Sequence, residues 1–212
     1  MYLWQAVALV GLDPLSSAGR FAVLIATLSC WSAFDVVWIG GAIRSRGEGF
    51  GARGARIWAV AALLALVEAF APFWKALTIS SLPLRLAGLP VLGVGTVVAI
   101  WSRLTLGAMW SSVPEVRSAR TLCTTGPYRY VRHPIYAGVL GMVLGTSLVA
   151  GFGPWILVSA AFTAMVAARI PKEETVLAEA FGARFDRYAD TVPRLLPRMT
   201  ATARRLNRRP DR

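Results

Sequence analysis

The chain has 212 residues, of which 56% are hydrophobic and only 16% are charged, a balance that excludes an ordinary soluble domain. The formal net charge of +12 would suit a nucleic-acid-binding protein, but most basic residues are arginines that flank apolar runs, which argues against that class. The two cysteines, Cys30 and Cys123, are too few and too far apart to predict a disulfide framework or a metal cluster.

Five apolar runs predict an all-α, polytopic membrane protein with about five transmembrane helices. The opening stretch 1–12 is apolar but lacks the basic start and the cleavage site of a signal peptide, and its aromatic residues suit an interfacial helix. A bilayer core of about 30 Å needs about 20 helical residues. Three runs reach or approach that length, and they are 21–43, 57–77 and 86–101.

Two shorter runs complete the predicted membrane region. They are 135–150 and 154–168, and only Gly151, Phe152 and Gly153 separate them. Glycines at such a short connection are typical of a tight turn between antiparallel helices. The two runs are therefore predicted to form a transmembrane hairpin that starts and ends on the same membrane face.

The arginines and lysines predict the orientation, because basic residues resist translocation and stay on the cytoplasmic side. Twenty of them lie in 44–56, in 103–134 and in the tail from Arg169, against three on the other side. The N-terminus is therefore predicted to be outside and the C-terminus cytoplasmic. The Arg-, Ala- and Gly-rich composition suggests a bacterial source, and hence an integral protein of the inner membrane.

Polar residues that could carry chemistry gather beside the predicted hairpin, on the cytoplasmic face. The segment 124–136 mixes turn residues, tyrosines, two arginines and His133, the only histidine of the chain. The hairpin should bring this segment next to Arg169, Glu173 and Glu174, which follow the last apolar run. Segments about forty residues apart would then form one site.

Pro171 predicts an end or kink of the last span, because proline cannot donate to the carbonyl four residues earlier. A new helix is expected to start there, with Glu173 and Glu174 in its first turn, where the helix dipole favours carboxylates. Apolar residues recur at spacings of three and four from Val176 to Tyr188. They predict an amphipathic C-terminal helix on the cytoplasmic membrane surface or over the site, where it could serve as a lid.

From about residue 100 to residue 197 the sequence resembles the isoprenylcysteine carboxyl methyltransferases and, more broadly, the membrane methyltransferases that include the phospholipid N-methyltransferases. The matching pieces stand in the same order and spacing, and they are Leu106-Gly107 with Trp110, Gly126-Pro127-Tyr128, Arg132-His133-Pro134-Ile135-Tyr136, Arg169 ahead of Glu173-Glu174, Phe181-Gly182, Tyr188, Val192-Pro193-Arg194 and Leu196-Pro197. The first hundred residues carry no comparable motif.

The resemblance implies a membrane methyltransferase that uses S-adenosylmethionine and takes a lipophilic methyl acceptor from the bilayer. Carried over to this chain, the family's cofactor contacts fall on Arg120, Thr121, Leu122, Cys123, Tyr128, His133, Pro134, Ile135, Tyr136 and Glu173. Arg169 matches the position that contacts the acceptor in the carboxyl methyltransferases. Two departures from the family occur, since Glu115 stands in place of a glutamine and Pro171-Lys172 in place of acidic residues.

These residue types suit the implied chemistry. Tyrosine faces can stack on adenine or attract a sulfonium, and Glu173 can bind amino or hydroxyl groups. A carboxylate acceptor needs no general base, and Arg169 would align it for attack. An amine acceptor must first lose a proton, which His133 or Glu174 could take. The predicted catalytic residues are therefore Arg169 and Glu174, without a metal.

Carboxyl O-methylation of an isoprenylcysteine-like or small lipid acid is the favoured activity. Three alternatives stay open: a phospholipid or other amine N-methyltransferase, an NADPH-dependent enzyme like the sterol reductases, which share a related C-terminal pattern, and a catalytically silent scaffold. Asp35 and Glu68 lie within predicted spans, where an ionisable group is costly. Either could pair with Arg103 or line the acceptor cavity.

The chain is predicted to form one membrane methyltransferase domain over 1–200, since no repeat or long linker divides it. Its N-terminal spans occupy 1–101, and the cofactor-binding and catalytic region occupies 102–197. Residues 201–212 hold five arginines among Asn, Pro and Asp, which predicts a disordered tail attracted to anionic lipids.

Overall fold

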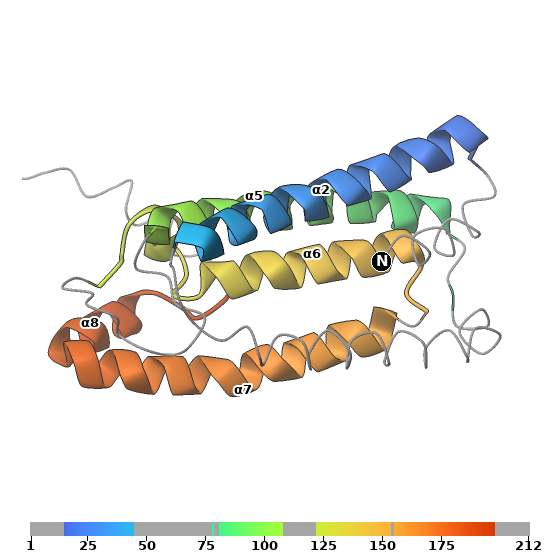
Figure 1. Cartoon of the computed structure of the whole chain (residues 1–212). Helices are drawn as coiled ribbons and strands as arrows, with labels where there is room; N and C mark the ends of the chain where they lie inside the picture. Colours follow the sequence, from blue (N-terminus) through green and yellow to red (C-terminus); the bar gives the residue numbers. More distant parts are fainter. Residues whose placement is uncertain (1–14, 45–77, 79–80, 108–121, 154, 198–212) are drawn as a thin grey trace, which may run out of the picture.

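A computed structural model of the chain describes residues 15–44, 78, 81–107, 122–153 and 155–197 (Figure 1). These residues are helical or irregular, apart from one isolated bridge between Thr78 and Phe152. The predicted all-α class is therefore confirmed. The predicted interfacial helix 1–12, the predicted span 57–77 and the predicted tail 201–212 lie outside the described residues.

The helices are α2 (Ser17–Arg44), α5 (Leu82–Leu106), the short 3₁₀ helix η2 (Gly126–Arg129), α6 (Pro134–Ala150), α7 (Trp155–Phe181) and α8 (Ala183–Thr191). Three of them, α2, α5 and α7, are long and apolar enough to cross a membrane, and α6 is a shorter apolar helix. Each predicted span that falls on described residues coincides with one of these four helices.

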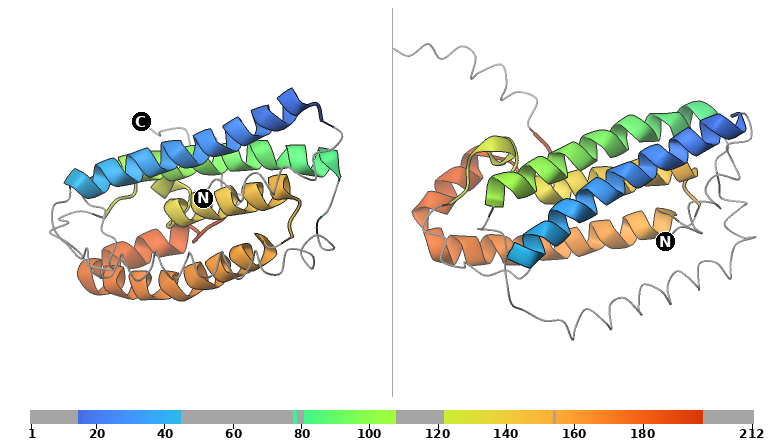
Figure 2. Two further views of the ribbon diagram at one scale, coloured as in Figure 1. Left: turned by 45° about the vertical axis from the view of Figure 1, so that its right-hand side comes forward. Right: turned by 45° about the horizontal axis from the view of Figure 1, so that its top comes forward.

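The long helices lie side by side and nearly along one direction (Figures 1 and 2). Helices α2, α5 and α6 form one packed group, and α7 runs back along α6 after the turn 151–153. The C-terminal ends of α2, α5 and α7 and the N-terminal end of α6 lie at one end of the bundle, here called the loop end. Helix α2 ends at the loop end, whereas Thr78 forms a bridge to Phe152 in the turn between α6 and α7 at the opposite end.

Glycines bring α5 and α6 into close contact. A Cβ on Gly95 would lie 2.6 Å from the Met142 nitrogen and 2.7 Å from the Gly138 oxygen, both backbone atoms, and Gly88 and Gly145 meet in the same way. Small residues at such an interface let two helix backbones approach closely, which is the usual means of packing helices in a bilayer. Gly88, Gly95, Gly138 and Gly145 therefore serve the packing of these two helices.

A Gly95→Ala variant should be less stable by about 1–3 kcal/mol, because the new methyl group would overlap backbone atoms that cannot move away independently. Gly93 is the matched control, since a Cβ there meets nothing within 4 Å. Thermal unfolding of both variants in the same detergent measures the difference. Equal unfolding midpoints for the two would contradict close α5–α6 packing.

Arg85 is buried at the other end of the bundle and ties α5 to the end of α6. It is 1% exposed, and its guanidinium donates to the carbonyls of Val149 (3.0 Å) and Ala150 (2.9 Å). These carbonyls belong to the last turn of α6, where the helix leaves acceptors without helical partners and favours positive charge. Arg85, counted in the sequence among the basic residues of the external side, thus has a structural role in holding the hairpin.

The predicted end of the last span at Pro171, with a new helix starting there, is wrong, because α7 continues through this residue from Trp155 to Phe181. Proline removes one helical hydrogen bond, but an ion pair spans the position, with Arg169 Nε 2.9 Å from Glu173 Oε1. Pairs four residues apart stabilise a helix turn, and this one lies across the missing bond. Glu173 and Glu174 therefore lie within a long helix and not in the first turn of a new one.

The amphipathic C-terminal helix is also shorter than predicted. Gly182, with φ of +49°, separates α7 from α8, so the apolar pattern from Val176 to Tyr188 is divided between two helices. Phe185 is the buried residue of α8. At about 1.5 Å per residue α7 is about 40 Å long, longer than the bilayer core, so its charged last third reaches the membrane face at the loop end.

Candidate functional site

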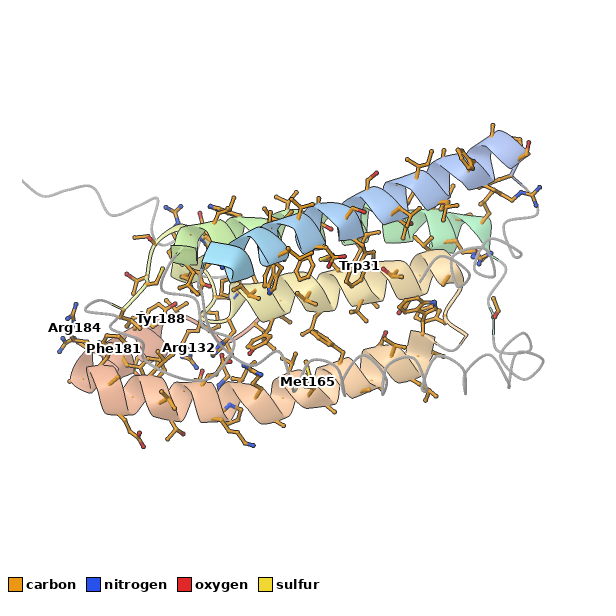
Figure 3. All side chains as sticks on the ribbon, in the orientation of Figure 1. Trp31, Arg132, Met165, Phe181, Arg184 and Tyr188 are labelled. Carbon is orange, nitrogen blue, oxygen red and sulfur yellow. The ribbon has the colours of Figure 1, made fainter. Side chains whose placement is uncertain are left out.

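Three segments meet at the loop end: 122–136 before and at the start of α6, the last third of α7, and the chain around and after α8. Figure 3 shows Arg132 and Tyr188 close together in this region, with Phe181 at the bend between α7 and α8. The hairpin brings the segment before α6 beside Glu173 and Glu174, as the sequence indicated.

Tyr128 lies in η2, shortly before the segment that enters α6. Gly126 adopts φ of +55°, and a Cβ there would lie 2.9 Å from the Thr105 hydroxyl of α5, so glycine allows the turn to sit on the helix. Tyr128 is buried, and its carbonyl accepts a 2.6 Å hydrogen bond from the Tyr188 hydroxyl. Burial raises the pKa of Tyr128 well above its usual value, so its phenol stays neutral.

Glu173 lies at the centre of one group of contacts. Its Oε1 accepts from the Tyr136 hydroxyl at 2.5 Å and from Arg169 Nε at 2.9 Å. Its Oε2 lies 3.8 Å from Nδ1 of His133. The side chain is 23% exposed, so a small molecule at the loop end could reach it.

Glu174, the next residue, has a different set of partners. Its Oε1 accepts from Arg132 Nε at 3.0 Å and from His133 Nε2 at 3.2 Å. Its Oε2 accepts from Arg194 Nε at 3.0 Å and from Nη2 at 2.7 Å. A carboxylate paired with two guanidinium groups is a poor proton acceptor, so these contacts favour a positioning role, and its catalytic role stays a prediction.

His133 bridges the two carboxylates. An ionised carboxylate only accepts hydrogen bonds, so Nε2 must carry the proton that it shares with Glu174. Burial lowers the pKa of His133, although both glutamates oppose the shift. The imidazole is then neutral near pH 7, and its Nδ1 is an acceptor that faces a second acceptor, Glu173 Oε2.

The lowered pKa of His133 predicts a loss of stability in mild acid. Below its ordinary pKa of 6.5 the unfolded histidine binds a proton that the folded site resists, so the unfolding free energy should fall as the pH drops from about 6.5. A His133→Gln variant should lack this slope, because the chain has no other histidine. Thermal-unfolding midpoints of both proteins between pH 8 and pH 5.5 measure it, and parallel curves would contradict the assignment.

The other predicted cofactor contacts lie along the same segment. Pro134 is buried in the first turn of α6, Ile135 follows it, and Leu122 and Cys123 are half-buried in irregular chain. Both cysteines are free thiols. Arg120, Thr121, Glu68 and Glu115 lie outside the described residues, and Asp35 is half-buried on α2.

The residue-by-residue predictions did not include the part that Arg132, Tyr188 and Arg194 play at the loop end. All three belong to the pieces that carry the family resemblance, but the resemblance implied no specific contact for any of them. A signal was present in their position, because Tyr188 and Arg194 follow the two glutamates within the pieces that carry the resemblance. Their partners depend on the return of the chain through α8 to the loop before α6.

Comparisons with known proteins point to membrane methyltransferases. Residues 84–184 match the model of the phospholipid methyltransferase family. The chain is 38% identical over 77 residues to the protein-S-isoprenylcysteine O-methyltransferase of Schizosaccharomyces pombe, a match that covers 36% of this chain and 33% of that one. It is 33% identical over 116 residues to a probable protein-S-isoprenylcysteine O-methyltransferase of Oryza sativa subsp. indica, covering 52% and 59%.

A relative with a different name matches as well. The cobalt-zinc-cadmium resistance protein CzcN of Cupriavidus metallidurans is 35% identical over 104 residues, covering 47% of this chain and 46% of that one. The matches thus span between a third and three fifths of these relatives' lengths.

A solved structure, the eukaryotic intramembrane Ras methyltransferase ICMT (isoprenylcysteine carboxyl methyltransferase), superposes with a TM-score of 0.58. The sequence identity is 24%, and the match covers 84% of this chain and 64% of that one. At this identity the likeness shows a shared fold. The α-helical bundle described above is therefore a fold that a known intramembrane enzyme also uses.

Proposed function

Because residues 84–184 match the model of the phospholipid methyltransferase family, we propose that this protein is a membrane methyltransferase that uses S-adenosylmethionine and methylates the carboxylate of a lipophilic acceptor. The named relatives that methylate isoprenylcysteine support the carboxylate. The natural acceptor is then an isoprenylcysteine-like compound or a small lipid acid. We place the protein in a bacterial inner membrane, with its C-terminus and site on the cytoplasmic side.

One observation carries the proposal, and it is the pair of acceptors formed by His133 Nδ1 and Glu173 Oε2, 3.8 Å apart. Two acceptors at this separation repel each other unless a donor binds between them. The amino group or the ribose hydroxyls of S-adenosylmethionine are such donors. The residues present at the loop end therefore fit this cofactor.

The remaining predicted contacts would complete the cofactor site. Tyr128 and Tyr136 offer aromatic faces, each worth about 0.5–2 kcal/mol toward a cation. The backbone of 120–123 and the turn at Pro134 and Ile135 would hold the rest of the molecule. When bound, S-adenosylmethionine supplies an electrophilic methyl group on a sulfonium.

Arg169 is assigned to the acceptor carboxylate. Its Nε bond to Glu173 fixes the plane of the guanidinium, which has five N–H donors and suits a carboxylate. A fixed guanidinium would hold the attacking oxygen in line with the methyl group, and no general base is needed because the acceptor is already ionised. Glu174 is then free of any proton-transfer duty in this reaction.

Calorimetric titration of the purified full-length protein with S-adenosylmethionine and, separately, with NADPH tests the cofactor. We expect binding of the first and none of the second. Binding of NADPH alone would favour the sterol-reductase-like alternative, and binding of neither would overturn both enzymatic proposals.

The name of the matched family favours a second candidate, which is N-methylation of a phospholipid amine. Labelled methyl transfer to a prenylated cysteine, a fatty acid and phosphatidylethanolamine separates the two. Alkaline treatment releases methanol from a methyl ester but not from an N-methyl amine. If the methyl label is transferred to phosphatidylethanolamine and survives alkali, the acceptor group is an amine and not a carboxylate.

A further inference from the structure

The chain that follows α7 returns to the segment that precedes α6 and contacts it at both main chain and side chain. The residues that return are 188–194, which we call the strap. Figure 3 shows Tyr188, from the strap, beside Arg132, from the segment that it covers. The family resemblance included this part of the sequence, but the proposed function assigns it nothing.

Backbone bonds attach the strap in register. The amide of Arg132 donates to the Pro193 carbonyl at 2.8 Å, and the amide of His133 donates to the Arg194 carbonyl at 2.9 Å. Further back, the Tyr188 hydroxyl donates to the Tyr128 carbonyl at 2.6 Å. The strap therefore binds the loop 128–133 at both of its ends.

Side chains add a second layer of attachment. The Arg132 guanidinium donates to the carbonyls of Ala189 and Val192, the latter at 2.9 Å, and so closes the C-terminal end of α8. The same group donates to Glu174 of α7 through Nε. Arg132 thus joins the loop, the strap and α7.

Arg194 fastens the free end of the strap. Its guanidinium makes a two-pronged contact with Glu174 Oε2, and Glu174 in turn holds His133. Arg194 is 57% exposed, whereas Glu174 is 11% exposed. The arginine can therefore be replaced without opening the core, while its effect reaches a buried group of the cofactor site.

We propose that the strap holds the loop 128–133 in its cofactor-binding shape, and that Arg194 is the positioning residue that fastens the strap to Glu174. The proposal rests on the proposed function for its ligand, S-adenosylmethionine. The side chain of Arg194 contacts Glu174 and none of the predicted cofactor contacts, so it acts on His133 through Glu174. Its loss should weaken cofactor binding and leave the reacting groups in place.

The test compares Arg194→Ala and Arg194→Lys with Arg187→Ala in the full-length protein. Arg187 is an exposed arginine of α8 and serves as the control. Hydrogen exchange of a peptide that spans the amides of Arg132 and His133 should become about fivefold faster in Arg194→Ala, a size in keeping with a partly exposed two-pronged ion pair. The KM for S-adenosylmethionine should rise by a similar factor, with kcat nearly unchanged.

Arg194→Lys should recover part of both effects, because lysine keeps the charge but not the two-pronged geometry. Arg187→Ala should behave as the unchanged protein. The proposal is overturned if Arg194→Ala leaves the hydrogen exchange and the KM for S-adenosylmethionine unchanged. It is also overturned if exchange rises equally in α5 and α6, because that would mean general destabilisation. If the unchanged protein binds no S-adenosylmethionine while the exchange difference persists, the proposed function fails and the strap remains as a structural device.

Discussion

Replacing Glu173 by glutamine is expected to weaken binding of S-adenosylmethionine by about a hundredfold, the upper range for losing a charged hydrogen-bonding group. The carboxylate accepts from Tyr136 and Arg169 and faces His133 Nδ1. An amide in its place removes the negative charge and presents N–H donors to these groups. The amino or hydroxyl groups of the cofactor would then lose their charged acceptor.

Calorimetry on Glu173→Gln measures this loss, and Glu179→Gln is the matched control. Glu179 lies on the same helix and is exposed. The control should bind as the unchanged protein does. Unaltered affinity in Glu173→Gln would mean that the cofactor, if bound, lies elsewhere.

A Glu174→Ala variant is expected to lose stability rather than affinity alone. Removing the carboxylate leaves Arg132 and His133, whose side chains are 11% and 6% exposed, without their shared acceptor. Breaking such a pair costs about 3 kcal/mol, because one buried charge stays without a partner. For a chain of this size the unfolding midpoint should fall by on the order of 10 °C.

Thermal unfolding in detergent tests this expectation, with Glu179→Ala as the control. Glu174→Gln should lose less, since an amide oxygen still accepts from Arg132. Adding Arg194→Ala to Glu174→Ala should cost little more, because the two residues stabilise the protein through one shared contact. If the unfolding midpoint of Glu174→Ala falls no further than that of Glu179→Ala, Glu174 does not have this structural role.

The two glutamates are neighbours in sequence but have different partners. Successive residues of a helix point about 100° apart. On α7 this rotation directs Glu173 to Tyr136 and Arg169, and Glu174 to Arg132 and Arg194. Glu173 is therefore the carboxylate proposed to bind the cofactor, and Glu174 is the one that links α7 to the segments before α6 and after α8.

The transmembrane architecture could be predicted from the sequence, because a bilayer imposes a length and an apolar character on every span. The hairpin between 135–150 and 154–168 followed from its glycine turn, where Gly151, Phe152 and Gly153 all have positive φ. The juxtaposition of His133 and Tyr136 with Glu173 followed from the hairpin. The assignment of these residues to a cofactor stays a prediction.

Two local rules failed at the C-terminal end of the chain. Proline usually ends a helix, yet α7 continues through Pro171, where an ion pair lies across the lost hydrogen bond. The apolar spacing from Val176 to Tyr188 predicted one amphipathic helix, yet Gly182 turns the chain so that Phe185 and Tyr188 pack at the loop end. Neither outcome can be read from spacing alone.

The sequence by itself determined that this is a helical membrane protein and which residue types lie at its basic face, because apolar length and charge act on each segment independently of its neighbours. Only the tertiary structure decided that Arg85 closes the end of α6, that Glu174 binds Arg132 and Arg194, and that 188–194 covers the loop before α6. These contacts depend on the path of the chain after Gly182 and on the rotation of each helix about its axis. A hydrogen bond is directional, so residue type limits its possible partners, and the fold selects among them.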